Sequence, residues 1–135
     1  MIPVFQTRFG GKDVPVEERG NCFQAAVASI LELPLDVVPN IQEYDDNLDW
    51  YDIFSKWLEK FGFGFLCFPA GGSGIIQGYH LIGCKSTTLG EGECHTLVGF
   101  NQEVAHDPNP NAKTVGKVED YIVFTALNPA VKGDR

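Results

Sequence analysis

Two short segments of the chain carry residue types that can act together as a nucleophile and its base. Cys22 follows Asn21, a favoured N-cap residue, and opens the Ala-rich run of residues 22–31, which has high helix propensity. A cysteine in the first turn of a helix lies among unpaired backbone N–H groups at the positive end of the helix dipole, which favours a thiolate. We therefore interpret Cys22 as a candidate nucleophile, with a small buried core residue as the alternative.

The second segment supplies the base that such a nucleophile needs. His95 lies in an apolar, strand-like segment, and Asp107 ends the next segment of this kind. If residues 100–102 form a three-residue hairpin loop, His95 lies directly opposite Asp107, and opposed side chains can hydrogen-bond. A two-residue turn would bring His106 to the His95 face instead. The choice of histidine therefore depends on the length of one turn.

In the favoured register, Asp107 holds one ring nitrogen of His95 while the other nitrogen faces Cys22. This geometry lets the imidazole take the thiol proton and later protonate a leaving amine. A tetrahedral oxyanion also needs hydrogen-bond donors. The backbone N–H of Cys22 is one candidate, and the side-chain amide of Gln6 is the second.

The elements that must position these residues are two helices followed by a sheet. The first helix is expected over residues 22–32, because Pro34 ends it, and the second over 48–61, where apolar residues recur at helical spacing. From residue 63 the period shortens to two, which predicts strands at 63–68, 78–85, 93–100, 103–107 and 120–126. The acidic segment 40–47 is expected to be exposed. This order predicts an α+β fold in which the cysteine helix packs on a mostly antiparallel sheet.

Composition and charge limit the class of protein. A chain of 135 residues with 44% hydrophobic content fits a single domain over residues 1–135. The net charge of -8 argues against nucleic acid or an anionic membrane as partner, because both are bound through Lys and Arg. The sequence shows neither an export signal nor an apolar run long enough to cross a membrane. We therefore expect a cytoplasmic protein with its four cysteines reduced.

A metal site is the main alternative for the histidines and cysteines of the expected sheet. His80, Cys84, Cys94 and His95 are residue types that bind zinc, but the sequence has neither a Cys-x-x-Cys nor a His-x-x-x-His pair. As strand neighbours, Cys94 and His95 would also point to opposite faces. We therefore expect no metal and no other cofactor, and we interpret Cys94 as structural.

Taken in order, four features of the chain resemble the papain-like cysteine peptidase superfamily: Gln6, the helix start Gly20-Asn21-Cys22, the strand beginning Cys94-His95-Thr96, and the pair Asp107-Pro108. The likeness is nearest to double-glycine leader peptidases and to small bacterial and phage papain-fold proteins. The resemblance implies a papain-like fold with Cys22 as nucleophile, His95 as general base and acid, Asp107 as the orienting residue and Gln6 as oxyanion donor. In the family, however, the glutamine lies only a few residues before the nucleophile.

Together these features predict a cysteine-dependent hydrolase, a peptidase or amidase that cleaves a peptide or isopeptide bond in a peptide or protein substrate. Two alternatives stay open. The same fold could serve as a catalytically silent binding module, and the same triad could transfer an acyl group to an amine. Faster alkylation of Cys22 than of the other three cysteines would favour an enzyme over a binding module.

Overall fold

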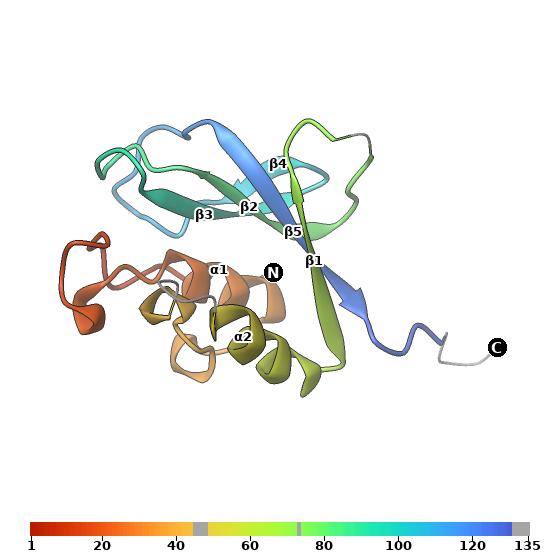
Figure 1. Ribbon diagram of the computed structural model, residues 1–135. Helices are drawn as coiled ribbons and strands as arrows, with labels where there is room; N and C mark the ends of the chain where they lie inside the picture. The colour runs from red at the N-terminus through yellow and green to blue at the C-terminus, as the bar shows by residue number, and fades with distance from the viewer. Residues whose placement is uncertain (45–48, 73, 131–135) are drawn as a thin grey trace.

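The computed structural model describes residues 1–44, 49–72 and 74–130, and within these residues the architecture is α+β. Two α-helices, α1 (Cys22–Leu31) and α2 (Asp49–Glu59), lie together on one side of a five-stranded antiparallel sheet (Figure 1). The order across the sheet is β1-β5-β2-β3-β4. The strands are β1 (Phe63–Pro69), β2 (Tyr79–Lys85), β3 (Cys94–Phe100), β4 (Glu103–His106) and β5 (Val118–Ala126).

α1 packs closely on the sheet because its middle turns carry small, fully buried side chains. Residues 25–28, three alanines and a valine, are 0% exposed. The helix ends at Leu31, and its C-cap residue Glu32 adopts the left-handed conformation two residues before Pro34. The predicted helix over residues 22–32 is therefore confirmed to within one residue.

α2 contributes the large side chains of the core. Phe54 and Leu58 are fully buried and pack in one cluster with Leu81 and Val98 of the sheet. The helix ends at Glu59, two residues earlier than predicted, and the chain turns into β1 through Gly62 at a φ of 84°. Residue 48, the predicted start of this helix, lies outside the described residues.

The turn between β3 and β4 differs from the prediction. Phe100 pairs with Glu103, so the turn has two residues, Asn101 and Gln102, and not the three residues 100–102. Both turn residues have a positive φ, 51° and 68°, which is the conformation of a tight hairpin turn whose twist matches that of the strands. The predicted three-residue loop is wrong.

A bulge in β4 then changes the register a second time. Val104 pairs with Gly99, but His106 pairs with Val98, so Ala105 is an additional residue on this strand. Because side chains alternate along a strand, one extra residue reverses the face of every residue that follows it. The bulge therefore directs His106 to the Val98 face of the sheet.

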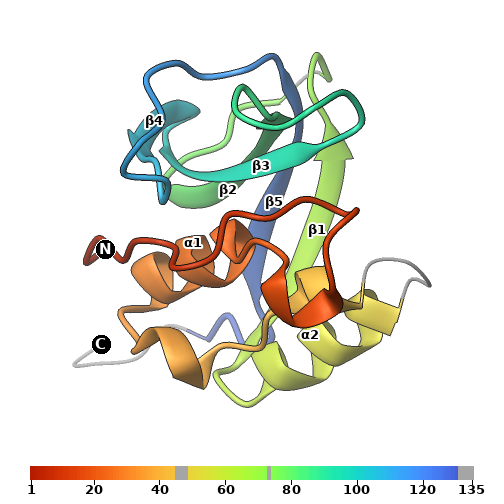
Figure 2. The same cartoon turned by 90° about the vertical axis from the view of Figure 1, so that its left-hand side faces the viewer.

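The N-terminal segment links α1 to the sheet. In Figure 2 it crosses in front of α1 and below β3 before the chain turns back into the helix. The Ile2 N–H donates to the carbonyl of Ser29 on α1 (3.0 Å), and the Gln6 N–H donates to the carbonyl of Pro108, after β4 (2.9 Å). These bonds hold residues 2–6 beside both layers.

The segment after α1 is less exposed than predicted. Asn40 and Ile41 are only 8% and 5% exposed, and the short 3-10 helix η3 (Ile41–Glu43) begins here. The Asn40 amide donates to the carbonyl of Gly20, which packs η3 against the start of α1 (3.4 Å). The prediction of an exposed segment over 40–47 is therefore wrong at these two residues, and residues 45–47 lie outside the described residues.

Among the described residues, the structure contains no helix with the length and apolar character needed to cross a membrane.

Candidate active site

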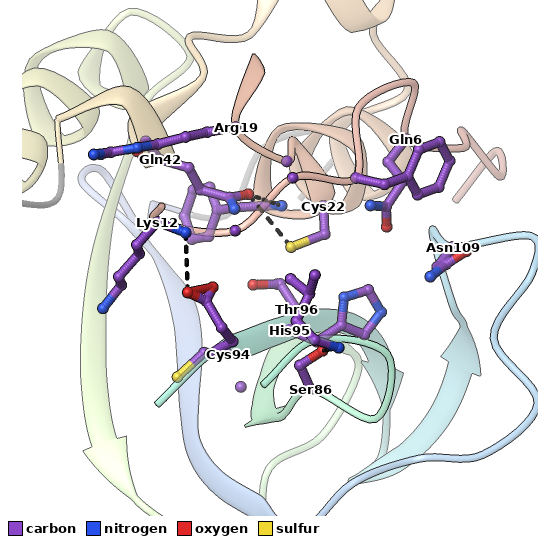
Figure 3. Close-up of a pocket in the computed structure, with 18 of the residues that line it drawn as sticks. Gln6, Lys12, Arg19, Cys22, Gln42, Ser86, Cys94, His95, Thr96 and Asn109 are labelled. Carbon is purple, nitrogen blue, oxygen red and sulfur yellow. Dashed lines mark hydrogen bonds between the residues drawn. The ribbon is translucent and has the colours of Figure 1, made fainter. Parts of the chain in front are cut away.

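A cleft of about 250 Å³ lies between the start of α1 and the beginning of β3. Figure 3 shows Cys22 on the helix side and His95 on the sheet side, facing each other across it. Gln6 also lines the cleft. The structure thus brings together three residues that lie far apart in the sequence, with 89 positions between Gln6 and His95.

Asp107 orients His95. The ring Nε2 of His95 lies 2.7 Å from the carboxylate Oδ1 of Asp107. With the two-residue turn alone, Asp107 would lie on the opposite face from His95, and the bulge at Ala105 restores it to the same face. The predicted contact between His95 and Asp107 is therefore present, but it arises from a two-residue turn and a bulge, neither of which was predicted.

Opposite pKa shifts stabilise this pair as imidazolium and carboxylate. Burial alone would lower the pKa of His95, but hydrogen bonds and charge interactions with Asp107 and Cys22 outweigh it and raise the pKa to about 9. Burial would raise the pKa of Asp107, but hydrogen bonds from His95 and from the Asn109 N–H, 2.9 Å away, lower it below its usual value. Nδ1 of His95 is the ring nitrogen left for the Cys22 side.

Cys22 is the first residue of α1 and is only 5% exposed. Its thiol donates to the side-chain Oε1 of Gln42 over 3.3 Å, and the same oxygen accepts the Phe23 N–H over 3.1 Å (Figure 3). The sulfur therefore lies at a helix start, as predicted. Gln42 was not among the predicted site residues.

Asn21 is the N-cap residue of α1, as predicted, but its side chain makes no capping hydrogen bond to the helix. Its side-chain oxygen accepts hydrogen bonds from the backbone N–H groups of Thr7 and Arg8, both at 2.9 Å. The Asn21 side chain is thus committed to the N-terminal segment, and Gln42 supplies the acceptor for a backbone N–H in the first turn of α1. Asn21 acts instead by fixing the path of the chain past the cleft.

Gln6 reaches the cleft from the N-terminal segment and is 7% exposed. Figure 3 shows its amide directed toward the space between Cys22 and Asn109. One N–H of this amide donates to the carbonyl of Arg8 (3.0 Å), which leaves a second N–H on the same nitrogen. Its Oε1 is buried and has no hydrogen-bond partner within the described part of the chain.

Two loops meet across one end of the cleft. The Lys12 N–H donates to Oε1 of Glu93 over 2.9 Å, and Figure 3 shows this bond beside the cleft. A Cβ on Gly11 would lie 2.9 Å from the Glu93 carboxylate, so the glycine allows the close approach. The long polar loop that separates Gln6 from Cys22 thus forms part of the cleft wall.

The other three cysteines differ from Cys22 in their surroundings. Cys84 is buried, and burial raises its pKa to about 11. Cys67 and Cys94 are exposed, and partial desolvation is the main cause that raises their pKa values. Cys94, which the sequence analysis treats as structural, also lines the cleft. Across residues 1–44, 49–72 and 74–130, no group of three or more His, Cys, Asp or Glu side chains is arranged to hold a metal ion.

Two residues of the site, Gln42 and Asn109, were not predicted from the sequence. The Asp-Pro-Asn order of residues 107–109 is a turn pattern that favours a bond from the third residue to the first side chain, so Asn109 had a local signal. Gln42 had none for its contact with Cys22, because the two residues lie 20 positions apart in sequence and belong to different elements.

Comparison of the chain with family models, with curated proteins and with solved structures found no match. The class of site is therefore defined by its own geometry: a cysteine at a helix start, a histidine across a cleft and an aspartate bonded to that histidine.

Proposed function

We propose that this protein is a cysteine-dependent hydrolase of papain-like fold, a peptidase or amidase that cleaves a peptide or isopeptide bond without a cofactor. The observation that supports the proposal most strongly is the placement of His95. Its Nε2 is held by Asp107 at 2.7 Å, while the ring lies across the cleft from Cys22. This is the arrangement that activates a thiol for attack on a carbonyl.

The proposed reaction has two halves. The Cys22 thiolate attacks the carbonyl carbon, forming a C–S bond, and the tetrahedral intermediate collapses as His95 gives its proton to the leaving amine. The C–N bond breaks and a thioester remains. Water then attacks the thioester carbonyl while His95 accepts a proton from it, and breaking of the C–S bond releases the acid and the free cysteine.

Two groups are suited to hold the oxyanion. The Cys22 N–H lies at the start of α1, where backbone donors are not used within the helix. The second N–H of Gln6 is the side-chain donor, and the buried position of its amide keeps it on the cleft. Donors fixed before reaction stabilise the developing charge without reorganising.

The overall charge favours some partners over others. A net charge of -8 makes a neutral or basic peptide or protein easier to approach than an anionic one. All four cysteines are free, which suits the cytoplasmic setting that we propose.

Alkylation of the wild-type protein by iodoacetamide tests the nucleophile. Cys22 is expected to be alkylated faster than the exposed Cys67 and Cys94, because the thiolate and not access controls the rate. Peptide mass spectrometry measures the rate at each cysteine. His95→Ala should slow only Cys22, and Cys94→Ser is the matched control, because it removes a cleft cysteine without touching the pair. Alkylation in the order of exposure, with Cys22 slower than both Cys67 and Cys94, would contradict the proposal.

Reaction with p-nitrophenyl acetate separates the hydrolase from its two alternatives. A hydrolase acylates Cys22 and releases more than one equivalent of nitrophenolate, and the release is abolished by Cys22→Ala. A binding module fails to turn over. An acyltransferase releases nitrophenolate much faster once a small amine such as glycine ethyl ester is added, and the acetylated amine accumulates.

A further inference from the structure

Gln42 and His95 approach the sulfur of Cys22 from different sides (Figure 3). Oε1 of Gln42 accepts two hydrogen bonds at the start of α1, from the Cys22 thiol at 3.3 Å and from the Phe23 N–H at 3.1 Å. A single carboxamide oxygen from a distant segment thus accepts hydrogen bonds from both the thiol and the neighbouring backbone N–H.

The position of Gln42 is fixed by buried neighbours. Its N–H donates to the Asn40 side chain (3.3 Å), and its carbonyl accepts a bond from Nη1 of Arg19 (3.3 Å). Asn40 and Arg19 are each 8% exposed, and Asn40 also donates to the carbonyl of Gly20. The contact between Gln42 and Cys22 is therefore part of the packing of η3 against the helix start.

A carboxamide oxygen and an imidazolium act on a thiol in opposite directions. The oxygen can only accept, so it stabilises S–H and repels a negative sulfur. It also takes the Phe23 N–H, one of the donors that would otherwise stabilise a thiolate at this helix start. His95 carries a raised pKa, and its positive ring favours the thiolate. Cys22 lies between groups that favour different protonation states.

We infer that Gln42 favours the thiol form of Cys22, so that the fraction of thiolate, and with it the rate of attack, rises when the bond from Sγ–H to Oε1 breaks. The thiol then turns toward His95. The S–H bond breaks, its electron pair stays on sulfur, the proton passes to solvent water, and the Nδ1–H of the His95 imidazolium donates to the new thiolate. This inference rests on the proposed function, because it assigns Gln42 a part in controlling the same nucleophile.

The test is the rate of Cys22 alkylation by iodoacetamide between pH 5 and pH 10, read by peptide mass spectrometry in the full-length chain. Gln42→Met keeps the length of the side chain but has no carboxamide acceptor, whereas Gln42→Glu keeps an acceptor and adds a negative charge. The other charged groups lining the cleft are the same in all three proteins: Lys12, Arg19, Glu93, His95 and Asp120. Differences between the profiles therefore report on position 42.

Gln42→Met is expected to raise the rate of Cys22 alkylation at neutral pH roughly two- to tenfold, because it removes one hydrogen bond to the thiol. It should also move the midpoint of the pH–rate profile to lower pH. Gln42→Glu is expected to lower the rate and move the midpoint to higher pH. If Gln42 had only a structural role, both substitutions would change the rate of Cys22 alkylation in the same direction. Because Gln42→Glu retains the bond to Phe23, it decides the question even if Gln42→Met unfolds.

Unchanged midpoints, or shifts of the opposite signs, overturn the inference. Shifts of the opposite signs would mean that the carboxamide presents an N–H to the sulfur. The proposed function fails separately. If the midpoints move as expected but p-nitrophenyl acetate is not turned over, the restraint stands and the hydrolase does not. If turnover depends on Cys22 and His95 but the midpoints stay, the hydrolase stands and the restraint does not.

Discussion

His95 and His80 lie on neighbouring strands of the same sheet, and their surroundings shift the pKa in opposite directions. His95 faces the cleft and bonds Asp107, and its pKa is raised to about 9. His80 is 0% exposed, and burial lowers its pKa although its Nδ1–H donates to the Gly78 carbonyl at 3.0 Å. The interactions of His95 with Asp107 and Cys22 thus outweigh its desolvation, whereas one backbone carbonyl does not outweigh that of His80.

The packing around His80 shows that this histidine is a buried structural residue of the sheet. Its Nε2 is buried, with no hydrogen-bond partner among the residues that the structure describes. A Cβ on Gly99 would lie 2.5 Å from that nitrogen, so the glycine of the neighbouring strand makes room for the ring. The Tyr121 ring also packs against His80 in an edge-to-face arrangement, with the ring centroids 5.7 Å apart. The comparison shows that a histidine becomes chemically useful through its partner, and not through its place in a sheet.

Removing the carboxylate should give the largest effect on this comparison. In Asp107→Ala, His95 loses both its orienting bond and the charge that raises its pKa, so turnover of p-nitrophenyl acetate is expected to fall roughly 10²- to 10⁴-fold. Asp107→Asn is the matched control. It keeps an oxygen acceptor but no charge, so the pKa of His95 should fall in both variants while turnover falls less in Asp107→Asn. NMR titration of the His95 ring and steady-state kinetics measure the two quantities, and an unchanged His95 pKa in Asp107→Ala would break the comparison.

The raised pKa of His95 also predicts a loss of stability at alkaline pH. The folded pKa of about 9 lies above the ordinary 6.5, so the stabilisation is fully present below pH 6.5 and is lost as pH rises to 9. The loss should amount to up to about 3 kcal/mol in the free energy of unfolding. Urea unfolding of wild type and His95→Gln at pH 6 and pH 9.5 measures it. The variant should lose less stability over this range, and an equal loss in both proteins would contradict the assignment.

The smallest expected effect is that of His80→Gln on the free energy of unfolding at acidic pH. Its folded pKa lies below 6.5, so the unfolded chain takes up the proton first. The stability contributed by neutral His80 is therefore present above pH 6.5 and falls as pH decreases below it. Urea unfolding between pH 7 and pH 5 should show a shallower decline for His80→Gln than for wild type. Parallel declines in the two proteins would show that protonation of His80 does not contribute to the pH dependence of stability.

The order of elements could be predicted from the sequence because it depends on local patterns. Helical spacing of apolar residues and the prolines after α1 set the helices to within a few residues, and alternation set the strands. The pairing of Cys22 with His95 and Asp107 was predicted from their complementary chemistry and from a hairpin register whose turn length was wrong. The helix start at Cys22 follows from the favoured N-cap residue Asn21 and the Ala-rich run after it.

What the sequence determined by itself is therefore the set of elements and the identity of the residues with chemistry to offer. Only the tertiary structure decided how they meet. With the two-residue turn alone, Asp107 would lie on the opposite face of the sheet from His95, and the bulge at Ala105 brings it to the same face. The bulge depends on how β4 pairs with β3, so the sequence of one strand does not determine it. The contact of Gln42 with the sulfur likewise joins elements 20 residues apart. Local propensity acts over a few residues, whereas such contacts exist only when distant segments pack.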